Sequence, residues 1–321
     1  MGTPSAVPGC LTRESSRSPR AALAALICLA GLAGCNTSEP VESASPDSLD
    51  QRVQELSDDN GLSYNGLSYN GLSYNGLSYN GLSYNGLSSA NFSTWFQGNP
   101  ALADQVMLYI VRCAMPAGQT LTYTDPQSNQ TYTWAGGLGL APSWSSGTPP
   151  TVQEQQVITA CLLAHTNKYR QHVTISVQGR DANSKEIPTS STELTDFSRR
   201  EACFFGNLFN GEGTYVGLDR GDFSTRESTS RACALMPSAG SSTSNCPPMV
   251  HIGSCASACT LDGSLTYYKT CTKNGTTYLP LTIRLRPQDV FTCGDGTCQI
   301  SESCGTGYQY YSCGADCGAC P

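Results

Sequence analysis

The stretch TVQEQQVITACLLAHTNKY, residues 151–169, opens with a start signal for a helix. Thr151 and Glu154 have the spacing of a capping box, in which each side chain satisfies a free backbone donor at the helix start. Apolar or packable side chains then recur at helical spacing on one face, at Ile158, Cys161, Leu162, His165 and Tyr169. The stretch therefore predicts a helix with one packed face that carries a cysteine.

A second helix is expected to precede this one. Asn99 suits the N-cap and Pro100 suits the first helical position, and Pro116 should end the helix because the residue before a proline avoids the α region. The apolar face of this helix is predicted at Leu102, Val106, Tyr109, Ile110 and Cys113. Since each helix carries one cysteine on its packed face, we expect Cys113 and Cys161 to form a disulfide that joins the two helices.

Strand patterns flank the helices. Alternating residues around the turn-forming run 125–129 predict a hairpin over 121–134, and 173–177 reads as a short strand. A second hairpin is expected over 265–285 around Asn274-Gly275, with Pro280 placing its second strand at a sheet edge. Residues 178–264 read as loop-rich, and their five cysteines from Cys203 to Cys259 suggest that disulfides hold these loops. Together these elements predict an α+β domain over residues 90–290.

The glycine-rich run Gly136-Gly137-Leu138-Gly139 is interpreted as a tight turn. It has neither the glycine spacing of a dinucleotide-binding loop nor the Lys-Ser/Thr of a P-loop. It therefore gives no support to a phosphate-binding site.

The chain has 17 cysteines, of which fourteen follow residue 35. An even number of cysteines in an exported chain indicates a disulfide framework of up to seven bridges. Apart from the expected Cys113–Cys161 bridge, the spacing of the cysteines does not determine which of them are bonded to each other.

The N-terminal residues have the parts of a secretory signal. Arginines at positions 13, 17 and 20 precede the apolar run Ala21–Leu32, and small residues lead to Cys35. The apolar run is shorter than the about 20 residues of a membrane-spanning helix. Leu32-Ala33-Gly34-Cys35 resembles the lipobox of bacterial lipoproteins. The resemblance implies removal of residues 1–34, lipid on Cys35 and anchorage in the cell envelope, at the outer membrane or cell surface. Ordinary secretion, with Cys35 a plain thiol, is the alternative.

Two low-complexity segments follow the expected anchor. Residues 35–59 are rich in Ser, Asp and Glu and predict a disordered tether. Residues 60–89 contain Asn-Gly-Leu-Ser-Tyr five times and read as a flexible spacer. A coil that resembles the pentapeptide-repeat β-helix and an adhesive role for the repeat are the alternatives.

The C-terminal residues 291–321 form a separate cysteine-rich module. Six cysteines in this short segment predict a knot of three bridges in place of an apolar core. The Cys-Gly-Asp-Gly-Thr-Cys start resembles modules of secreted lipoproteins of myxobacteria. Calcium could bind the carboxylates of Asp295, Glu302 and Asp316; zinc on Cys313, Cys317 and Cys320 is the weaker alternative, because oxidised cysteines are not ligands.

Net charge excludes some partners. Removing residues 1–34 takes away three arginines and one glutamate from 18 basic and 25 acidic residues, so the expected mature chain is near −9. A chain this acidic, without a basic cluster, is a poor nucleic-acid binder.

No complete catalytic motif is present. His165, His172 and His251 are expected to be packed or on the surface, because no carboxylate completes a metal set. Gly253-Ser254-Cys255 resembles a fragment of the papain-type nucleophile motif, but Cys255 is expected in a disulfide. Arg220-Gly221-Asp222 is expected to be a surface turn.

These observations favour a lipid-anchored envelope protein that presents a disulfide-bonded domain to a protein or glycan partner without catalysis. The alternatives are an exported hydrolase that uses carboxylates which the sequence does not pair, and a structural or adhesive role of the repeat.

Overall fold

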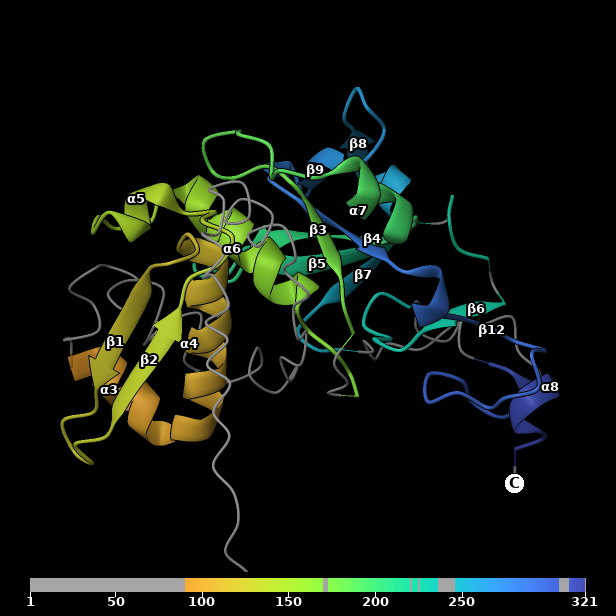
Figure 1. Ribbon diagram of the computed structural model, residues 1–321, viewed down its shortest axis with the longest axis horizontal. Helices are drawn as coiled ribbons and strands as arrows, with labels where there is room; N and C mark the ends of the chain where they lie inside the picture. Colours follow the sequence, from red (N-terminus) through yellow and green to blue (C-terminus); the bar gives the residue numbers. More distant parts are fainter. Residues whose placement is uncertain are drawn as a thin grey trace, which may run out of the picture. The chain divides into compact units, whose positions relative to one another are not determined.

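The structure is a computed structural model that describes residues 90–169, 173–219, 221–224, 226–235, 246–305 and 312–320. The expected signal, tether and repeat, with Cys35, lie outside the described residues, as do His172 and Arg220. The described part is α+β and rich in disulfides (Figure 1).

The helical part is built by α3 (Ala90–Gly98), α4 (Pro100–Ala114), α5 (Pro142–Ser145) and α6 (Val152–Ala164). The Asn99 side chain accepts a hydrogen bond from the backbone N–H of Leu102 at 3.2 Å, and Pro100 is the first residue of α4. Met115 takes an extended conformation ahead of Pro116 and ends the helix. Both ends of α4 therefore confirm the sequence prediction.

Helix α6 starts as predicted but is buried on all sides. Its capping box is complete, since Glu154 N–H donates to Thr151 Oγ1 at 3.2 Å and Thr151 N–H donates to Glu154 Oε2 at 2.8 Å. The helix ends at Ala164, so Tyr169 lies beyond it, and every residue from Gln156 to Ala164 is buried. The predicted single packed face is wrong because α6 contacts both α4 and the large sheet, so that polar Gln156 and Thr159 are buried along with the apolar residues.

The first hairpin is a ribbon of β1 (Thr120–Thr124) and β2 (Thr131–Ala135). Tyr123 and Trp134 are buried, while the threonines that alternate with them are exposed on the other face. Asp125 holds the turn by accepting hydrogen bonds from the backbone N–H groups of Gln127 and Ser128. The predicted hairpin is confirmed.

A five-stranded sheet forms the centre of the domain, in the order β3-β11-β4-β5-β7. Its strands are β3 (Ser176–Gly179), β11 (Leu281–Leu285), β4 (Arg199–Asn207), β5 (Gly213–Leu218) and β7 (Val250–Ser254). Neighbouring strands are antiparallel except β5 and β7, which are parallel. Residues 178–264, which the sequence analysis described only as loop-rich, supply three of these strands.

The second hairpin is shorter than predicted. Asn274 and Gly275 have positive φ and join β9 (Tyr268–Lys273) to β10 (Thr276–Tyr278), as a two-residue hairpin turn requires. Pro280 follows β10 and separates it from β11, which then enters the large sheet between β3 and β4. Pro280 thus marks a change of sheet, and the predicted edge position of residues 281–285 is wrong.

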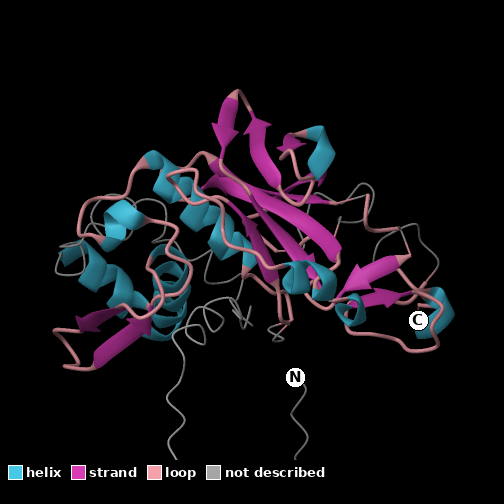
Figure 2. Cartoon of the chain, turned by 45° about the horizontal axis from the view of Figure 1, so that its top comes forward, coloured by secondary structure: helices cyan, strands magenta, loops and turns pink. Residues whose placement is uncertain are grey.

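Two layers cover the large sheet. Helix α6 packs on one face against β4 and β11, and the longer helices lie to the left of the sheet in Figure 2. A three-stranded sheet, β10-β9-β8, with β8 at Cys259–Leu261, is joined to the other side. A second apolar cluster, built around Phe205, Tyr215, Tyr268 and Tyr278, includes side chains from both sheets.

The cysteine-rich module continues from the domain through a small sheet. Strand β12 (Val290–Thr292) pairs with β6 (Glu227–Thr229), and Arg226 donates to the carbonyl of Cys293 at 3.0 Å. The remaining short elements are α7 (Ser191–Asp196), η2 (Cys255–Ser257), η3 (Pro287–Asp289) and α8 (Gly314–Cys317).

Seven disulfides join the fourteen cysteines that follow residue 35. They are Cys113–Cys161, Cys203–Cys255, Cys233–Cys246, Cys259–Cys271, Cys293–Cys313, Cys298–Cys317 and Cys304–Cys320. Within the described ranges, every helix is too short or too polar to cross a membrane.

Candidate functional site

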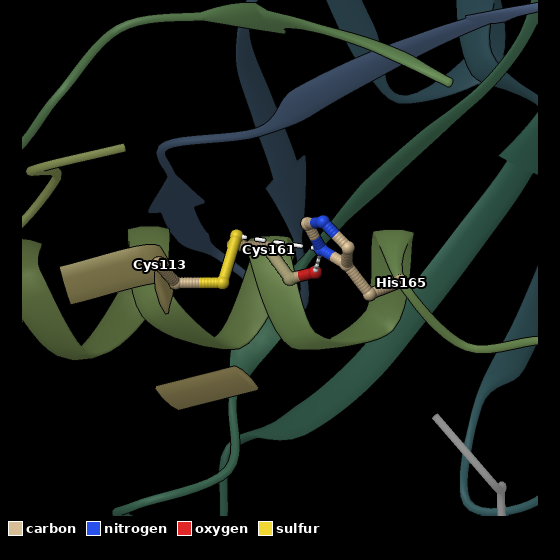
Figure 3. Close-up of side chains that lie close together, drawn as sticks. All are labelled: Cys113, Cys161 and His165. Carbon is tan, nitrogen blue, oxygen red and sulfur yellow. Dashed lines mark hydrogen bonds between the residues drawn. A yellow bond between two sulfur atoms is a disulfide. The ribbon is translucent and has the colours of Figure 1, made fainter. Parts of the chain in front are cut away.

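The disulfide between the two long helices lies beside a histidine (Figure 3). Cys113 of α4 and Cys161 of α6 are bonded, with their Cα atoms 6.1 Å apart, which is the pairing expected from their helical positions. His165 caps α6, and its Nδ1 lies 2.8 Å from the carbonyl oxygen of Cys161 and 3.6 Å from Cys161 Sγ. All three side chains are fully buried. The group formed by Cys113, Cys161 and His165 therefore lies inside the protein.

Burial keeps His165 neutral. It lowers the pKa of the imidazole to about 4, against the opposing effect of the hydrogen bond to Cys161. Since a carbonyl oxygen only accepts, Nδ1 of the neutral ring carries the proton and donates to it. His165 is thus a packed residue, one of the two roles expected from the sequence, and it caps α6 where the sequence had placed it inside the helix.

The lowered pKa of His165 predicts a loss of stability in acid. The unfolded chain binds a proton near pH 6.5 and the folded chain only near pH 4, so the free energy of unfolding falls as the pH drops through this window. A shift of this size corresponds to about 3 kcal/mol. Urea unfolding of the wild type and of His165→Gln at pH 7.5 and pH 4 measures this effect. The wild type should lose more unfolding free energy than the variant between the two pH values, and equal losses would contradict the prediction.

Reduction would be needed before this centre could hold a metal. The two sulfurs and a ring nitrogen of His165 lie within 4.8 Å of one another. A disulfide sulfur has no thiolate charge, which is the form that binds metals. His251 on β7 lies elsewhere, and burial lowers its pKa to about 4 as well.

Four further cysteines meet between the two sheets. Cys203 of β4 is bonded to Cys255 of η2, and Cys259 of β8 is bonded to Cys271 of β9. Cys259 Sγ lies only 3.6 Å from Cys203 Sγ, although the two belong to different bridges. We call these residues the four-cysteine centre. Because Cys255 is oxidised, the Gly253-Ser254-Cys255 fragment offers no nucleophilic thiol.

Gly217 makes room for this centre. A Cβ at this position would lie 2.9 Å from Cys203 Sγ and 2.9 Å from the backbone nitrogen of Cys255. Gly217→Ala should therefore lower the free energy of unfolding by about 1–3 kcal/mol, the usual cost of overpacking. Gly263→Ala is the matched control, since a Cβ there meets nothing within 4 Å. Chemical denaturation that gave both variants the same stability would refute the assignment.

A set of polar and ionisable side chains forms a row across the sheet, on the face opposite α6. Arg284 of β11 is the register partner of both Ser176 of β3 and Arg200 of β4, and residues in register point to the same face. Ser176 donates to Glu193 Oε1 at 2.7 Å at one end, and Arg200 Nε donates to Asp219 Oδ2 at the other. We call these five residues the polar row.

The electrostatics of the polar row come from burial and pairing. Burial raises the pKa of Glu193. Burial, then the nearby Asp219 carboxylate, raises the pKa of the Tyr268 hydroxyl, which donates to Asp219 Oδ2 at 3.0 Å. Desolvation lowers the pKa of Arg200, but the hydrogen bond to Asp219 and the attraction of nearby negative groups, Asp219 first, together outweigh it and raise the pKa. Within the row, Arg200 and Asp219 form an ion pair, whereas Glu193 is held by the Ser176 hydroxyl.

The arginines of the polar row tie loops to the sheet. Arg284 donates to the carbonyls of Phe197 at 2.7 Å and Ser198 at 2.8 Å, and Arg200 donates to the carbonyl of Leu265 at 2.6 Å. Hydrolases with two carboxylates hold them roughly 5–10 Å apart. The strands carrying Ser176 and Arg200, which contact Glu193 and Asp219, are two spacings, roughly 10 Å, apart. The geometry thus favours a structural clamp over an acid pair.

An ion pair is fully buried on the other side of β4. Arg231 Nε lies 3.1 Å from Glu201 Oε2, and both side chains have no exposed surface. Arg231 also donates to the carbonyl of Ala164 at 2.6 Å, at the end of α6, and Thr229 donates to Glu201 Oε1 at 3.1 Å. The pair thus connects α6, β4 and the segment after β6.

The module's predicted metal ligands are occupied by turns. Asp316 accepts from the backbone N–H groups of Gly294 at 2.6 Å and Gly296 at 3.0 Å, and Glu302 accepts from Gln299 N–H at 3.1 Å. Asp295 accepts from Thr297 N–H at 2.9 Å. Within the described residues, Asp316 lies within 4.8 Å of the sulfurs of Cys293 and Cys313, and neither Asp295 nor Glu302 belongs to such a group. Calcium binding there stays a prediction.

The zinc alternative does not fit the disulfides. Cys313, Cys317 and Cys320 belong to three different bridges, to Cys293, Cys298 and Cys304. Their thiolates are therefore not available together.

Sequence reasoning missed the polar row and the buried ion pair. Arg200 and Glu201 start β4, and the apolar run Ala202-Cys203-Phe204-Phe205 is the strand signal that would have placed them. No local pattern marks Asp219 or Arg231 as partners of these residues, because they come from other segments.

Comparison of the chain with protein-family models, with curated proteins and with solved structures gives no match.

Proposed function

We propose that this chain is a lipid-anchored protein of the cell envelope whose disulfide-bonded domain binds a protein or glycan partner and catalyses no reaction. Its lipid would be carried by Cys35, at the membrane end of the segment 35–89, and its binding surface by the α+β domain.

The complete pairing of the cysteines carries this proposal. Seven disulfides join all fourteen cysteines from Cys113 to Cys320, and such bridges persist in an oxidising extracellular or envelope compartment. Cys10 and Cys28 would leave with the signal. Cys35 is then the one cysteine of the proposed mature chain without a cysteine partner, as a lipidated residue would be.

The state of the charged groups supports binding over hydrolysis. In the described part of the chain, Asp219 is paired with Arg200, and Glu201 is paired with Arg231 inside the core. The Glu193 carboxylate accepts a hydrogen bond from the Ser176 hydroxyl, and the backbone N–H of Glu193 donates to Ser190 Oγ, the cap of α7. Carboxylates held in this way stabilise loops and strands. The adhesive role of the repeat concerns residues outside the described ranges and stays an alternative.

Cys35→Ser should abolish lipidation. Without the thiol no lipid can be attached, so the variant should lose incorporation of a palmitate analogue and move from the membrane fraction to the soluble fraction of a bacterial host. Intact-mass measurement of the purified chain checks the lipid directly.

Cys28→Ala is the matched control for this experiment, because it removes a cysteine of the apolar run Ala21–Leu32 and leaves Cys35 in place. It should be labelled like the wild type. Labelling that persists in Cys35→Ser, or an unlabelled wild type, would overturn the proposed anchor.

A further inference from the structure

The four-cysteine centre brings sulfurs of two bridges into contact. Cys259 Sγ and Cys203 Sγ are 3.6 Å apart. The sulfurs of Cys203, Cys259 and Cys271 all lie within 4.8 Å of one another. Among the clusters of potential ligands found in the described residues, this is the one that combines two different bridges. Contact between a sulfur and a neighbouring disulfide is where thiol–disulfide exchange begins.

Access to the centre is restricted to one side. Cys203, Cys255 and Cys271 are buried, whereas Cys259 is only half-buried. Cys259 lies on the three-residue strand β8, which is an edge of the three-stranded sheet. A thiol that approaches from solvent therefore meets the Cys259–Cys271 bridge at Cys259 first.

We propose that the four-cysteine centre is a thiol–disulfide exchange site that reacts with dithiols and then rearranges its bridges. A thiolate of the dithiol attacks Cys259 Sγ, and Cys271 leaves as a thiolate that takes a proton from water. The second thiol of the dithiol then attacks the dithiol sulfur that is bonded to Cys259. This attack releases the Cys259 thiolate and the oxidised dithiol. Two electrons have then passed from the dithiol to the Cys259–Cys271 bridge.

The second step needs no further reductant. The Cys259 thiolate attacks Cys203 Sγ, with which it is already in contact, and the Cys203–Cys255 bond breaks. Cys255 leaves as a thiolate and is protonated. The product has a Cys203–Cys259 bridge, between β4 of the large sheet and β8 of the small sheet, and free thiols at Cys255 and Cys271.

Partial reduction tests the proposal on the full chain. One equivalent of dithiothreitol, followed by alkylation and non-reducing peptide mapping, should yield a Cys203–Cys259 peptide with alkylated Cys255 and Cys271. A parallel experiment with reduced thioredoxin distinguishes protein dithiols from small-molecule dithiols. If both reagents give the rearranged bridge, the site reacts with protein dithiols as well. If only dithiothreitol does so, the site reacts with small-molecule dithiols alone. Alkylated Cys259 and Cys271 with an intact Cys203–Cys255 bridge would overturn the proposal.

A variant tests the second step without any reductant. In Cys271→Ser, Cys259 is left without its partner, and its thiolate should displace Cys255, so that the Cys203–Cys259 peptide is recovered and Cys255 is alkylated. The matched control is Cys246→Ser, in which Cys233 should be the alkylated residue, with no rearranged bridge. Recovery of alkylated Cys259 alone from Cys271→Ser would also overturn the proposal.

Discussion

Arg231→Met should lower the free energy of unfolding by about 3–5 kcal/mol at neutral pH, the usual cost of removing one partner of a buried ion pair. The substitution leaves the Glu201 carboxylate in the core without its counter-charge, since both side chains are fully buried. It also removes the donor to the carbonyl of Ala164 at the end of α6. Chemical denaturation of the oxidised protein measures the loss.

Two comparisons make this prediction specific. Arg180→Met is the same substitution in an exposed pair, where Glu186 is 60% accessible, and should cost less than about 1 kcal/mol. The double variant Arg231→Met with Glu201→Leu should recover most of the stability, because no unpaired charge remains. An Arg231→Met loss as small as that of Arg180→Met would contradict the assignment.

The parts of the fold that the sequence predicts correctly depend on local signals. Asn99-Pro100 and the Thr151/Glu154 capping box use hydrogen bonds that close within a few residues. The first hairpin depends on alternation and on a turn whose side chain bonds its own backbone. Cys113 and Cys161 could be paired because each lies on a predicted helix, so a local pattern fixed the position of both.

The parts that the sequence does not predict depend on contacts between distant segments. Residues 281–285 alternate like an edge strand after Pro280, yet they are central because β3 and β4 flank them on both sides. Polar and apolar residues do not alternate along the buried part of β4, because helix α6 covers one of its faces and aromatic residues cover the other. The partner of Arg200 is 19 residues away and that of Arg231 is 30 residues away, and neither has a spacing rule.

Replacement of Cys113 and Cys161 together by alanine should lower the free energy of unfolding by about 4 kcal/mol, the chain-entropy value for a separation of 48 residues. The bridge is the sole disulfide with a cysteine before residue 203 in the seven that the structure describes. The helices and the β1–β2 ribbon would therefore lose all covalent cross-linking. Urea unfolding with the other bridges intact measures the effect.

The double alanine variant of Cys233 and Cys246 is the matched control. All four cysteines are fully buried, so the two variants remove equally buried sulfurs and differ in the loop they open. The Cys233–Cys246 loop spans only 13 residues and lies inside the loop that Cys203–Cys255 already closes. Its entropic contribution is at most about 3 kcal/mol, and less when the outer bridge already restricts the unfolded chain. If removing Cys233–Cys246 costs as much as removing Cys113–Cys161, packing around the sulfurs and not loop closure determines the contribution of these bridges.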